Sequence, residues 1–560
     1  MSPTDFSIAD CDFSQVKEIV EKWCANDPDI DSVNKLKNYL AEKDLNKLSN
    51  SFNGLLEFGT AGLRGPLIPG PSGMNLAVVQ RAAAAIAAFM SARNMKSVVI
   101  GMDARFGSTD FAKLSAQILA GAGMQTWLFP TVCPTPLLAF AVNYLSADVG
   151  IMVTASHNPA SDNGYKVYLG KSVDGIAFNG SQIISPIDKE IAQLMREVNF
   201  PIKKSNEFVM LNNSIEVAYL SACNKFATAK TDKKSDFKIV YTPLHGVGAE
   251  LFLNEMSLAG FNSISVVTEQ AKPDPKFPTV PFPNPEENGA LDLAITLASQ
   301  SSADLLIAHD PDADRCAIAT NFDGKWQMWR GDEVGAIIGR YLQRKLNYQP
   351  NRKNYPRAFA NSLVSSTLLG EIAKSGRISY SQTLTGFKWV SKVPNLFYGY
   401  EEALGYCVDP EKVNDKDGIS AGLLLAELAF ECKERKISLR EYLKQIYRKH
   451  GWFITNQISL RFESIEQAKQ KLTQFQNDYP KELADKPIKR IYDLNNGYAG
   501  LPATEGIIIF YGKKSEIRVI VRPSGTEPKM KCYVEVKDKS ESVANKLLSQ
   551  ACEQLTRVLS

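Results

Sequence analysis

Three aspartates at alternate positions are the clearest candidates for chemistry in this sequence. Asp310, Asp312 and Asp314 directly follow an apolar run that reads as a buried strand. Alternate residues of an extended segment point the same way, so three carboxylates can face one cation, and three oxygen ligands with open positions suit Mg²⁺. A calcium EF-hand does not fit, because its sixth position should be glycine and is Arg315, and its twelfth should be glutamate and is Asn321. A solvated acidic turn is the alternative to a metal site.

A second polar loop follows the apolar strand GIMV and contains Ser156 beside His157. A serine at the end of a strand, next to a histidine, indicates nucleophilic or phosphoryl chemistry. The loop lacks the G-x-S-x-G surroundings of a hydrolase elbow, which argues against a serine esterase. An ordinary polar turn is the alternative, since the segment is rich in turn formers. Lys166 follows shortly afterwards in the segment NGYK.

Two further loops carry groups that bind sugars and phosphates. Glu401 and Glu402 lie between flanking glycines, and carboxylates accept hydrogen bonds from sugar hydroxyls. Adjacent glutamates are also common on solvated turns, so this signal is weak by itself.

The last of these loops follows the strand EIRVIV and begins at Arg522. Its guanidinium, the hydroxyls of Ser524 and Thr526, and the exposed amides around Gly525 make a phosphate grip, with a basic turn as the alternative. The chain has no Walker loop, and Gly246-Val247-Gly248 lacks the third small residue of a dinucleotide fingerprint, so a kinase or a dehydrogenase has little support.

The elements around these loops follow a repeated strand–helix–strand pattern. It runs through residues 76–153, 238–309 and 358–402, and predicts mostly parallel sheets buried on both faces. Ala147-Asp148 and Ala303-Asp304 each introduce an apolar strand that runs into a polar loop, which indicates a structural repeat. Ligands gather beyond the carboxyl ends of such strands, so the loops are expected to converge on one central cleft.

The sequence therefore predicts three tandem α/β domains with mixed, mostly parallel sheets, followed by an α+β domain. The expected parts are a helical extension and four domains: residues 1–50, 51–212, 213–329, 330–450 and 451–560. The proline-rich stretch 273–285 excludes regular helix or central strand and is expected to be an ordered surface loop of the second domain.

Composition narrows the class of protein. The 560 residues are 44% hydrophobic and 22% charged, as in an average soluble protein, and 64 basic against 61 acidic residues leave a formal charge of +3. No concentrated positive field for nucleic acid is expected. The longest apolar run, Ala82–Met90, is too short to span a membrane. The first residues lack a secretory layout and nine cysteines are scattered singly, so we expect a cytoplasmic protein with reduced thiols.

Taken together, the loops resemble a known family. The ordered segments are GTAGLRG, TASHNP with a trailing NGYK, DPDADR, YEEALGY and RPSGTEPK. This set is similar to the α-D-phosphohexomutases over roughly residues 55 to 535. It looks most like the phosphoglucomutase branch, which also contains phosphopentomutases and glucose 1,6-bisphosphate synthases.

The resemblance implies a role for each residue of the loops. Ser156 would be the phosphoserine and would hold Mg²⁺ together with Asp310, Asp312 and Asp314. The transferring phosphoryl group would be surrounded by Arg64, His157 and Lys166, with Lys166 as the proton-transfer residue. Groups that contact the substrate would be Arg315, Lys388, Glu401, Arg522, Ser524, Gly525 and Thr526.

The predicted activity is interconversion of glucose 1-phosphate and glucose 6-phosphate, with glucose 1,6-bisphosphate as activator and intermediate. Ala403 replaces a serine found in many hexose mutases, which removes a hydroxyl that could bind the sugar and leaves mannose 1-phosphate and ribose 1-phosphate open. A metal-dependent sugar phosphatase and a non-catalytic sugar-phosphate sensor are the alternatives outside the mutases. The expected partners are small phosphosugars, with neither nucleic acid nor membrane, and the expected state is a monomer or weak homodimer. A mobile fourth domain carrying Arg522 is a further hypothesis.

Overall fold

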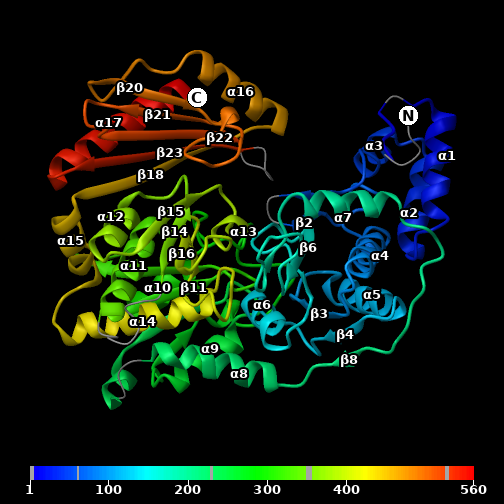
Figure 1. The fold of residues 1–560 in the computed structure, drawn as a ribbon, viewed down its shortest axis with the longest axis horizontal. Helices are drawn as coiled ribbons and strands as arrows, with labels where there is room; N and C mark the ends of the chain where they lie inside the picture. Colours follow the sequence, from blue (N-terminus) through cyan, green and yellow to red (C-terminus); the bar gives the residue numbers. More distant parts are fainter. Residues whose placement is uncertain are drawn as a thin grey trace. The chain divides into compact units, whose positions relative to one another are not determined.

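The computed structural model describes residues 6–9, 11–59, 62–227, 231–347, 356–523 and 529–559. They form two compact units, which are discontinuous along the chain. The first comprises Met1–Met328 and Gly405–Glu427, and the second comprises Trp329–Leu404 and Leu428–Ser560. Residues 405–427, which the sequence pattern assigns to the third domain, therefore belong to the first unit. Figure 1 shows the elements in chain order, from blue to red.

Three short helices open the chain, as the sequence predicts. They are α1 (Phe13–Cys24), α2 (Ile30–Ala41) and α3 (Leu45–Ser51), drawn in dark blue in Figure 1. Each begins after an aspartate whose side chain accepts a hydrogen bond from a backbone N–H of the first turn: Asp12, Asp29 and Asp44. These caps satisfy donors that the helix itself cannot.

The first α/β domain contains a mixed sheet in the order β1-β2-β6-β5-β3-β4-β8. The strands are β1 (Phe58–Gly59), β2 (Gly62–Pro66), β3 (Ser97–Met102), β4 (Gln125–Leu128), β5 (Val149–Val153), β6 (Asp162–Leu169) and β8 (Val209–Met210), with β7 (Ser181–Gln182) paired to β6. The helices are α4 (Leu76–Ala92), α5 (Ser108–Gly121), α6 (Thr135–Tyr144) and α7 (Ile187–Arg196). The predicted parallel core is confirmed, since β3 pairs in parallel with both β4 and β5.

The sequence pattern does not reveal β6, which is antiparallel to both β5 and β2. Asn163-Gly164 reads as a turn, yet both residues are buried in this strand. A Cβ at position 164 would lie 2.6 Å from the Thr154 carbonyl oxygen and 2.7 Å from that of Leu63, so glycine allows the neighbouring chains to approach.

The second α/β domain repeats this order. Its sheet runs β10-β9-β11-β12-β13, with β9 parallel to both β10 and β11 and antiparallel pairing from β11 to β12. The strands are β9 (Ile239–Thr242), β10 (Ile264–Val266), β11 (Leu305–His309), β12 (Cys316–Phe322) and β13 (Lys325–Met328), and the helices are α8 (Ser214–Cys223), α9 (Ala249–Leu258) and α10 (Asp292–Gln300). The proline-rich stretch forms neither helix nor strand, and Phe277 and Val280 from it are buried against Ala290.

The two Ala-Asp pairs in the repeat have the same structural role. The Asp148 carboxylate accepts hydrogen bonds from the backbone N–H groups of Lys96 and Ser97, where β3 begins. The Asp304 carboxylate accepts one from Lys238, immediately before β9. Each acid thus fixes the start of the parallel strand beside its own.

In the second unit, β14 (Ala358–Ser362) lies between β15 (Ser379–Thr383) and β16 (Leu396–Glu401), parallel to both. Its helices are α11 (Gly331–Asn347), α12 (Leu368–Ser375), α13 (Phe387–Val390) and α15 (Leu439–His450). β17 (Gly405–Cys407) belongs to the first unit, and α14 (Gly418–Glu434) contributes residues to both.

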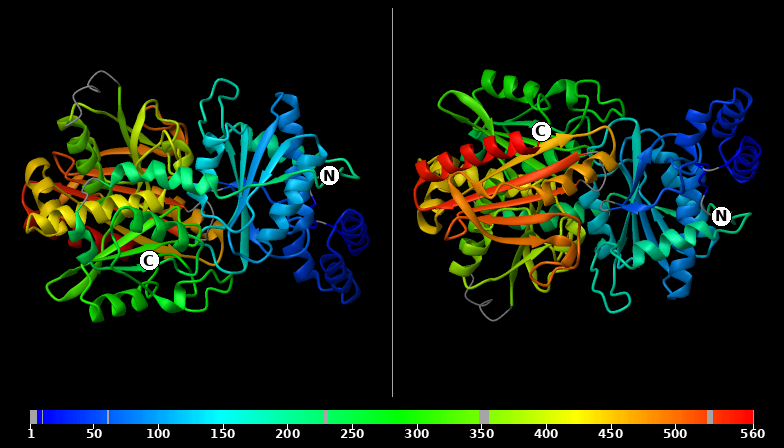
Figure 2. Two further views of the ribbon diagram at one scale, coloured as in Figure 1. Left: turned by 90° about the horizontal axis from the view of Figure 1, so that it is seen from below. Right: turned by 90° about the horizontal axis from the view of Figure 1, so that it is seen from above.

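The C-terminal domain is the predicted α+β fold. Its antiparallel sheet runs β18-β23-β22-β21-β20-β19, and Figure 2 shows α16 and α17 along one face of it. The bounds are β18 (Trp452–Arg461), β19 (Glu482–Leu483), β20 (Lys486–Asp493), β21 (Ile507–Tyr511), β22 (Ile517–Pro523), β23 (Lys529–Asp538), α16 (Ile465–Asn477) and α17 (Glu541–Leu559).

This last domain is attached to the loop that follows β14. Leu363 and Val364 pack in one buried cluster with residues of the C-terminal sheet, including Ile520. The Arg518 guanidinium donates to the backbone carbonyls of Leu363 and Ser365, at 3.1 and 2.6 Å. A lid motion of the fourth domain alone would have to break this contact.

No helix in the described ranges combines the length and the apolar character needed to cross a membrane.

A buried carboxyl on α9 makes stability depend on pH. Glu255 is 0% exposed, and within the described residues neither of its oxygens has a hydrogen-bond partner. Burial, and then the nearby charge of Asp417, raise the pKa of Glu255 from 4.5 to about 8. The unfolded chain releases this proton near pH 4.5, while the folded chain keeps it to about pH 8. The free energy of unfolding therefore falls as pH rises between these values.

We expect E255Q to raise the free energy of unfolding by about 1–3 kcal/mol at pH 8, and by less at pH 5. Urea unfolding at both pH values measures the difference. E250Q, at an exposed glutamate of the same helix, is the control and should change little. An E255Q effect that is equal at both pH values would contradict the account.

Candidate active site

Ser156 lies in the loop between β5 and β6 in a constrained conformation. Its φ is +53°, in the left-handed region that non-glycine residues rarely occupy, and the residue is 2% exposed. Its hydroxyl donates to Asp310 Oδ2 at 2.8 Å and lies 3.1 Å from His157 Nδ1. Its backbone N–H donates to the Thr154 hydroxyl at 2.9 Å. Strained backbone of this kind gathers at functional sites, where neighbouring groups hold it in place.

The three aspartates occupy the turn between β11 and β12. All are buried, and one carboxylate oxygen from each lies within 4.8 Å of the others. Burial, and then the charges of Asp312 and Asp314, raise the pKa of Asp310 well above its usual range. Asp312 Oδ1 and Asp314 Oδ1 are buried without a hydrogen-bond partner among the described residues. Such a set of buried oxygens fits a hard divalent cation.

Two lysines lie against the other oxygens of these aspartates. Lys166 Nζ, from β6, is 2.7 Å from Asp312 Oδ2 and 2.9 Å from Asp314 Oδ2, and Lys416 Nζ is 3.0 Å from Asp314 Oδ2. Burial lowers the pKa of Lys166, but Asp312 and Asp314 raise it further, so the net shift is upward. Lys166 therefore holds its proton in this arrangement.

Sequence reasoning missed Lys416. It lies in the charged run DPEKVNDKDG, where nothing separates it from solvated neighbours. The backbone places it: the Gly418 N–H donates to the Ala313 carbonyl at 3.1 Å, and the His309 ring contacts the Gly418 carbonyl oxygen at 2.9 Å. Residues 416–418 therefore lie against the aspartate turn.

Two arginines that the sequence selects lie near the same loops. Arg64 pairs with Gly164 across β2 and β6, and its Nη1 donates to Asn158 Oδ1 at 3.2 Å. The Arg315 N–H donates to Asp310 Oδ1 at 2.9 Å, and its guanidinium lies 3.6 Å from Glu286. The first unit thus brings together Ser156, His157, Lys166, Arg64, the three aspartates and Arg315.

Thr135 is a second residue that sequence reasoning missed. It is the first residue of α6, and its hydroxyl donates to Asp312 Oδ2 at 2.6 Å while its N–H donates to the Asp312 carbonyl at 2.9 Å. The segment CPTP at the start of a helix reads as an ordinary cap, so its contact with the aspartate turn is not visible in the sequence.

The second unit gathers the residues expected to bind the sugar. Glu401 ends β16, and its Oε1 accepts from the Gly386 N–H at 2.7 Å. Lys388 lies in α13, two residues further on, and Arg522 on β22 donates to the Thr385 hydroxyl. These three side chains therefore meet around the loop 385–388. Ser524, Gly525 and Thr526 lie outside the described residues.

The adjacent glutamates are held differently. Glu402 Oε2 accepts from the hydroxyls of Ser362 and Ser365, at 2.9 and 3.1 Å, and its N–H donates to Ser365. Glu402 is therefore tied to the loop after β14, while Glu401 is tied to the loop that carries Lys388.

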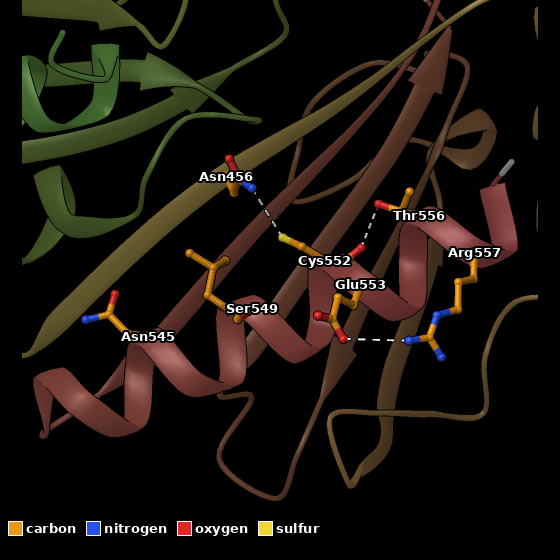
Figure 3. A pocket seen from close by; sticks show the side chains of 8 residues that line it. Asn456, Asn545, Ser549, Cys552, Glu553, Thr556 and Arg557 are labelled. Carbon is orange, nitrogen blue, oxygen red and sulfur yellow. Dashed lines mark hydrogen bonds and ion pairs between the residues drawn. The ribbon is translucent and has the colours of Figure 1, made fainter. Parts of the chain in front are cut away.

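The C-terminal domain has a pocket between α17 and β18, separate from the candidate site residues (Figure 3). Asn456 donates to the Cys552 sulfur at 3.4 Å across it. None of the site residues selected from the sequence lines it.

The comparisons with known proteins cover most of the chain. Phosphoglucomutase/phosphomannomutase α/β/α domains I, II and III match residues 55–201, 217–323 and 330–450, and the C-terminal domain of that family matches residues 500–548. The chain belongs to the phosphoglucomutase/phosphomannomutase family. It is accordingly an enzyme of the phosphomutase class, and the α/β assignment is confirmed.

Relatives in this family carry different substrate names. A Haemophilus influenzae protein named "Probable phosphomannomutase" is 40% identical, over 87% of this chain and 98% of its own length. The human "Phosphopentomutase" is 34% identical over 92% and 90%, and a Staphylococcus aureus "Phosphoglucomutase" is 33% identical over 87% and 90%. These relatives show the family, but their names do not agree on which sugar phosphate is the substrate.

A solved structure supports the fold. The open form of parafusin, a phosphoglucomutase from Paramecium, matches with a TM-score of 0.66 at 17% identity, over 90% of this chain and 94% of its own.

We expect T135V to lower the affinity for Mg²⁺ by about 10-fold, because Asp312 loses a hydrogen bond that orients its carboxylate. Calorimetric titration of the protein with MgCl₂ measures this. T126V removes the hydroxyl of another buried threonine, on β4, whose partner is the Met124 carbonyl, and should leave Mg²⁺ binding unchanged. Equal Mg²⁺ affinity in T135V and T126V would refute the role given to Thr135.

Proposed function

We propose that this enzyme moves a phosphoryl group between position 1 and the terminal hydroxyl of an aldose phosphate, through phosphorylated Ser156 and a sugar bisphosphate. One observation carries the proposal: the buried Ser156 hydroxyl lies 2.8 Å from the edge of a cluster of three buried aspartates. A nucleophile beside a cation site is the arrangement that phosphoryl transfer requires, since its catalysis depends on positioning and charge stabilisation.

The residues of the first unit would have three roles: binding the cation, orienting the phosphoryl group and delivering a proton. Asp310, Asp312, Asp314 and Ser156 would hold Mg²⁺, which when bound offsets negative charge on phosphoryl oxygens. Arg64 and His157 would orient the phosphoryl group, and Lys166 would deliver a proton to the sugar oxygen that leaves. The position of Lys166 supports this role, because its Nζ lies 2.7 Å from Asp312 Oδ2 and 2.9 Å from Asp314 Oδ2, beside the proposed cation site.

The residues of the second unit would recognise the rest of the substrate. Glu401 accepts hydrogen bonds, as sugar hydroxyls require, while Lys388 and Arg522 are suited to the phosphate that does not react. We extend this phosphate role to Ser524, Gly525 and Thr526, and a substrate role to Arg315, on the resemblance of their segments. Each phosphate of the sugar bisphosphate must reach Ser156 in turn. The residues that bind the other phosphate therefore have to accept two orientations of the sugar.

For the sugar, we propose glucose 1-phosphate, with glucose 1,6-bisphosphate as intermediate and activator. Ribose 1-phosphate is the second candidate, because Ala403 supplies no hydroxyl beside Glu401 and a relative covering most of the chain is named phosphopentomutase. Mannose 1-phosphate is the third candidate, because the Haemophilus influenzae relative is named "Probable phosphomannomutase".

The first test uses an equal mixture of glucose, mannose and ribose 1-phosphates, with Mg²⁺ and a trace of glucose 1,6-bisphosphate. We expect the wild-type protein to convert one of the three sugars first, and ³¹P NMR follows the conversion. S156A should lose at least about 10³-fold of this activity. S161A, an exposed serine of the same loop, should keep it. Release of inorganic phosphate alone would indicate a phosphatase, and no change with intact binding would indicate a sensor.

We expect A403S to raise the rate ratio of glucose to ribose 1-phosphate by about 10-fold, because a hydroxyl added beside Glu401 can bond the larger sugar. Competition kinetics with both substrates measure the ratio. An unchanged ratio would show that position 403 does not contact the sugar.

A further inference from the structure

Arg105, which the proposed mechanism does not use, donates four hydrogen bonds to backbone carbonyls in and next to the Ser156 loop. It lies two residues after Asp103, in the segment that follows β3, and is 4% exposed. Its Nη2 donates to the carbonyls of Ser156 and Asn158, at 2.6 and 2.5 Å. Its Nη1 donates to those of Pro159 and Asp162, at 2.6 and 3.0 Å. Three carbonyl oxygens of the loop, and that of the first residue of β6, therefore converge on one guanidinium.

This convergence needs a cation of a particular shape. Four carbonyl dipoles pointing at one place repel each other, and a buried positive charge offsets that repulsion. A guanidinium presents its N–H groups in a rigid planar fork, whereas an ammonium has three donors on a flexible stem. Arginine can therefore satisfy all four carbonyls at once, and lysine cannot.

Arg105 is itself fixed from two sides. Asp103 Oδ2 lies 3.4 Å from its Nε, and Asp103 Oδ1 accepts from the Arg105 N–H at 2.9 Å and from Ser108 at 2.6 Å. The Phe277 ring, from the proline-rich stretch of the second domain, lies 4.9 Å from the guanidinium carbon. Arg105 therefore contacts both the proline-rich stretch and the Ser156 loop.

We propose that Arg105 is a positioning residue that keeps the strained Ser156 loop in one conformation while Ser156 gives up and regains its phosphoryl group. The inference rests on the proposed role of Ser156. Without the four bonds, the left-handed Ser156 would relax and its hydroxyl would leave Asp310. A displacement near 1 Å costs about 10²-fold in rate. Substrate contacts made by the second unit do not depend on this loop, so KM should change little.

The test compares R105K with R81K. Arg81 is also a buried arginine of the first domain, but it lies over the rings of Phe6, Trp23 and Phe200 and donates to the single carbonyl of Met195. We expect R105K to lower kcat by about 10²-fold with KM within about 3-fold, and to slow phosphorylation of Ser156 by sugar bisphosphate in single-turnover mass spectrometry. R81K should keep both rates, even if its melting temperature falls.

Hydrogen exchange of the loop amides gives a readout that does not need activity. We expect faster exchange at residues 155–163 in R105K, with unchanged exchange in β3 and β5. Wild-type kcat in R105K, or a loss that only follows the folded fraction and is matched by R81K, would overturn the inference. Absence of phosphoryl uptake at Ser156 in the wild type would instead overturn the proposed function.

Discussion

Mutual repulsion among three buried carboxylates is the constraint on which the first unit depends. Nearby lysines and hydrogen-bond donors keep the pKa values of Asp312 and Asp314 below the usual range even out of water, whereas burial and these two charges raise the pKa of Asp310. Those groups come from three separate parts of the chain: Thr135 and Lys166 from the first domain, Lys416 from residues 405–427, and Arg315 from the turn itself. The cluster that would bind a cation therefore also binds these segments into one unit.

The three α/β sheets solve one positioning problem in the same way. The polar loop follows β5, β11 or β16, each of which pairs with a central parallel strand: β3, β9 or β14. The loop that follows the central strand contacts the polar loop and supports it. Arg105 holds the carbonyls of the Ser156 loop, the Val247 N–H donates to the Pro311 carbonyl under the aspartate turn, and Ser365 binds Glu402. The repeat expected from the two Ala-Asp pairs thus extends to how each chemical loop is supported.

The sequence revealed the loops and the strands that precede them, because both have strong local signals. Apolar runs ending in clustered polar residues mark Ser156, the three aspartates and Glu401 without any knowledge of contacts. Supporting residues have no such signal. Lys416 sits in a run of mixed charges, Thr135 looks like a helix cap, and Arg105 is a single arginine in a loop, so only the folded contacts distinguish them. β6 was missed because Asn163-Gly164 is typical of turns, while here close packing requires the glycine. That all four loops face one cleft stays a prediction.

The discontinuity of the first unit has a consequence for biosynthesis. A ribosome delivers the chain from its N-terminus, and domains generally fold as they emerge. The aspartate turn is made well before Lys416, with the strands β14 to β16 synthesised between them. During that interval the acidic cluster lacks one of its two lysines, and residues 405–427 are not there to cover the turn. The second α/β domain therefore cannot reach its final packing until most of the third has been translated, and until then the nascent chain carries the aspartate turn without the Lys416 ion pair.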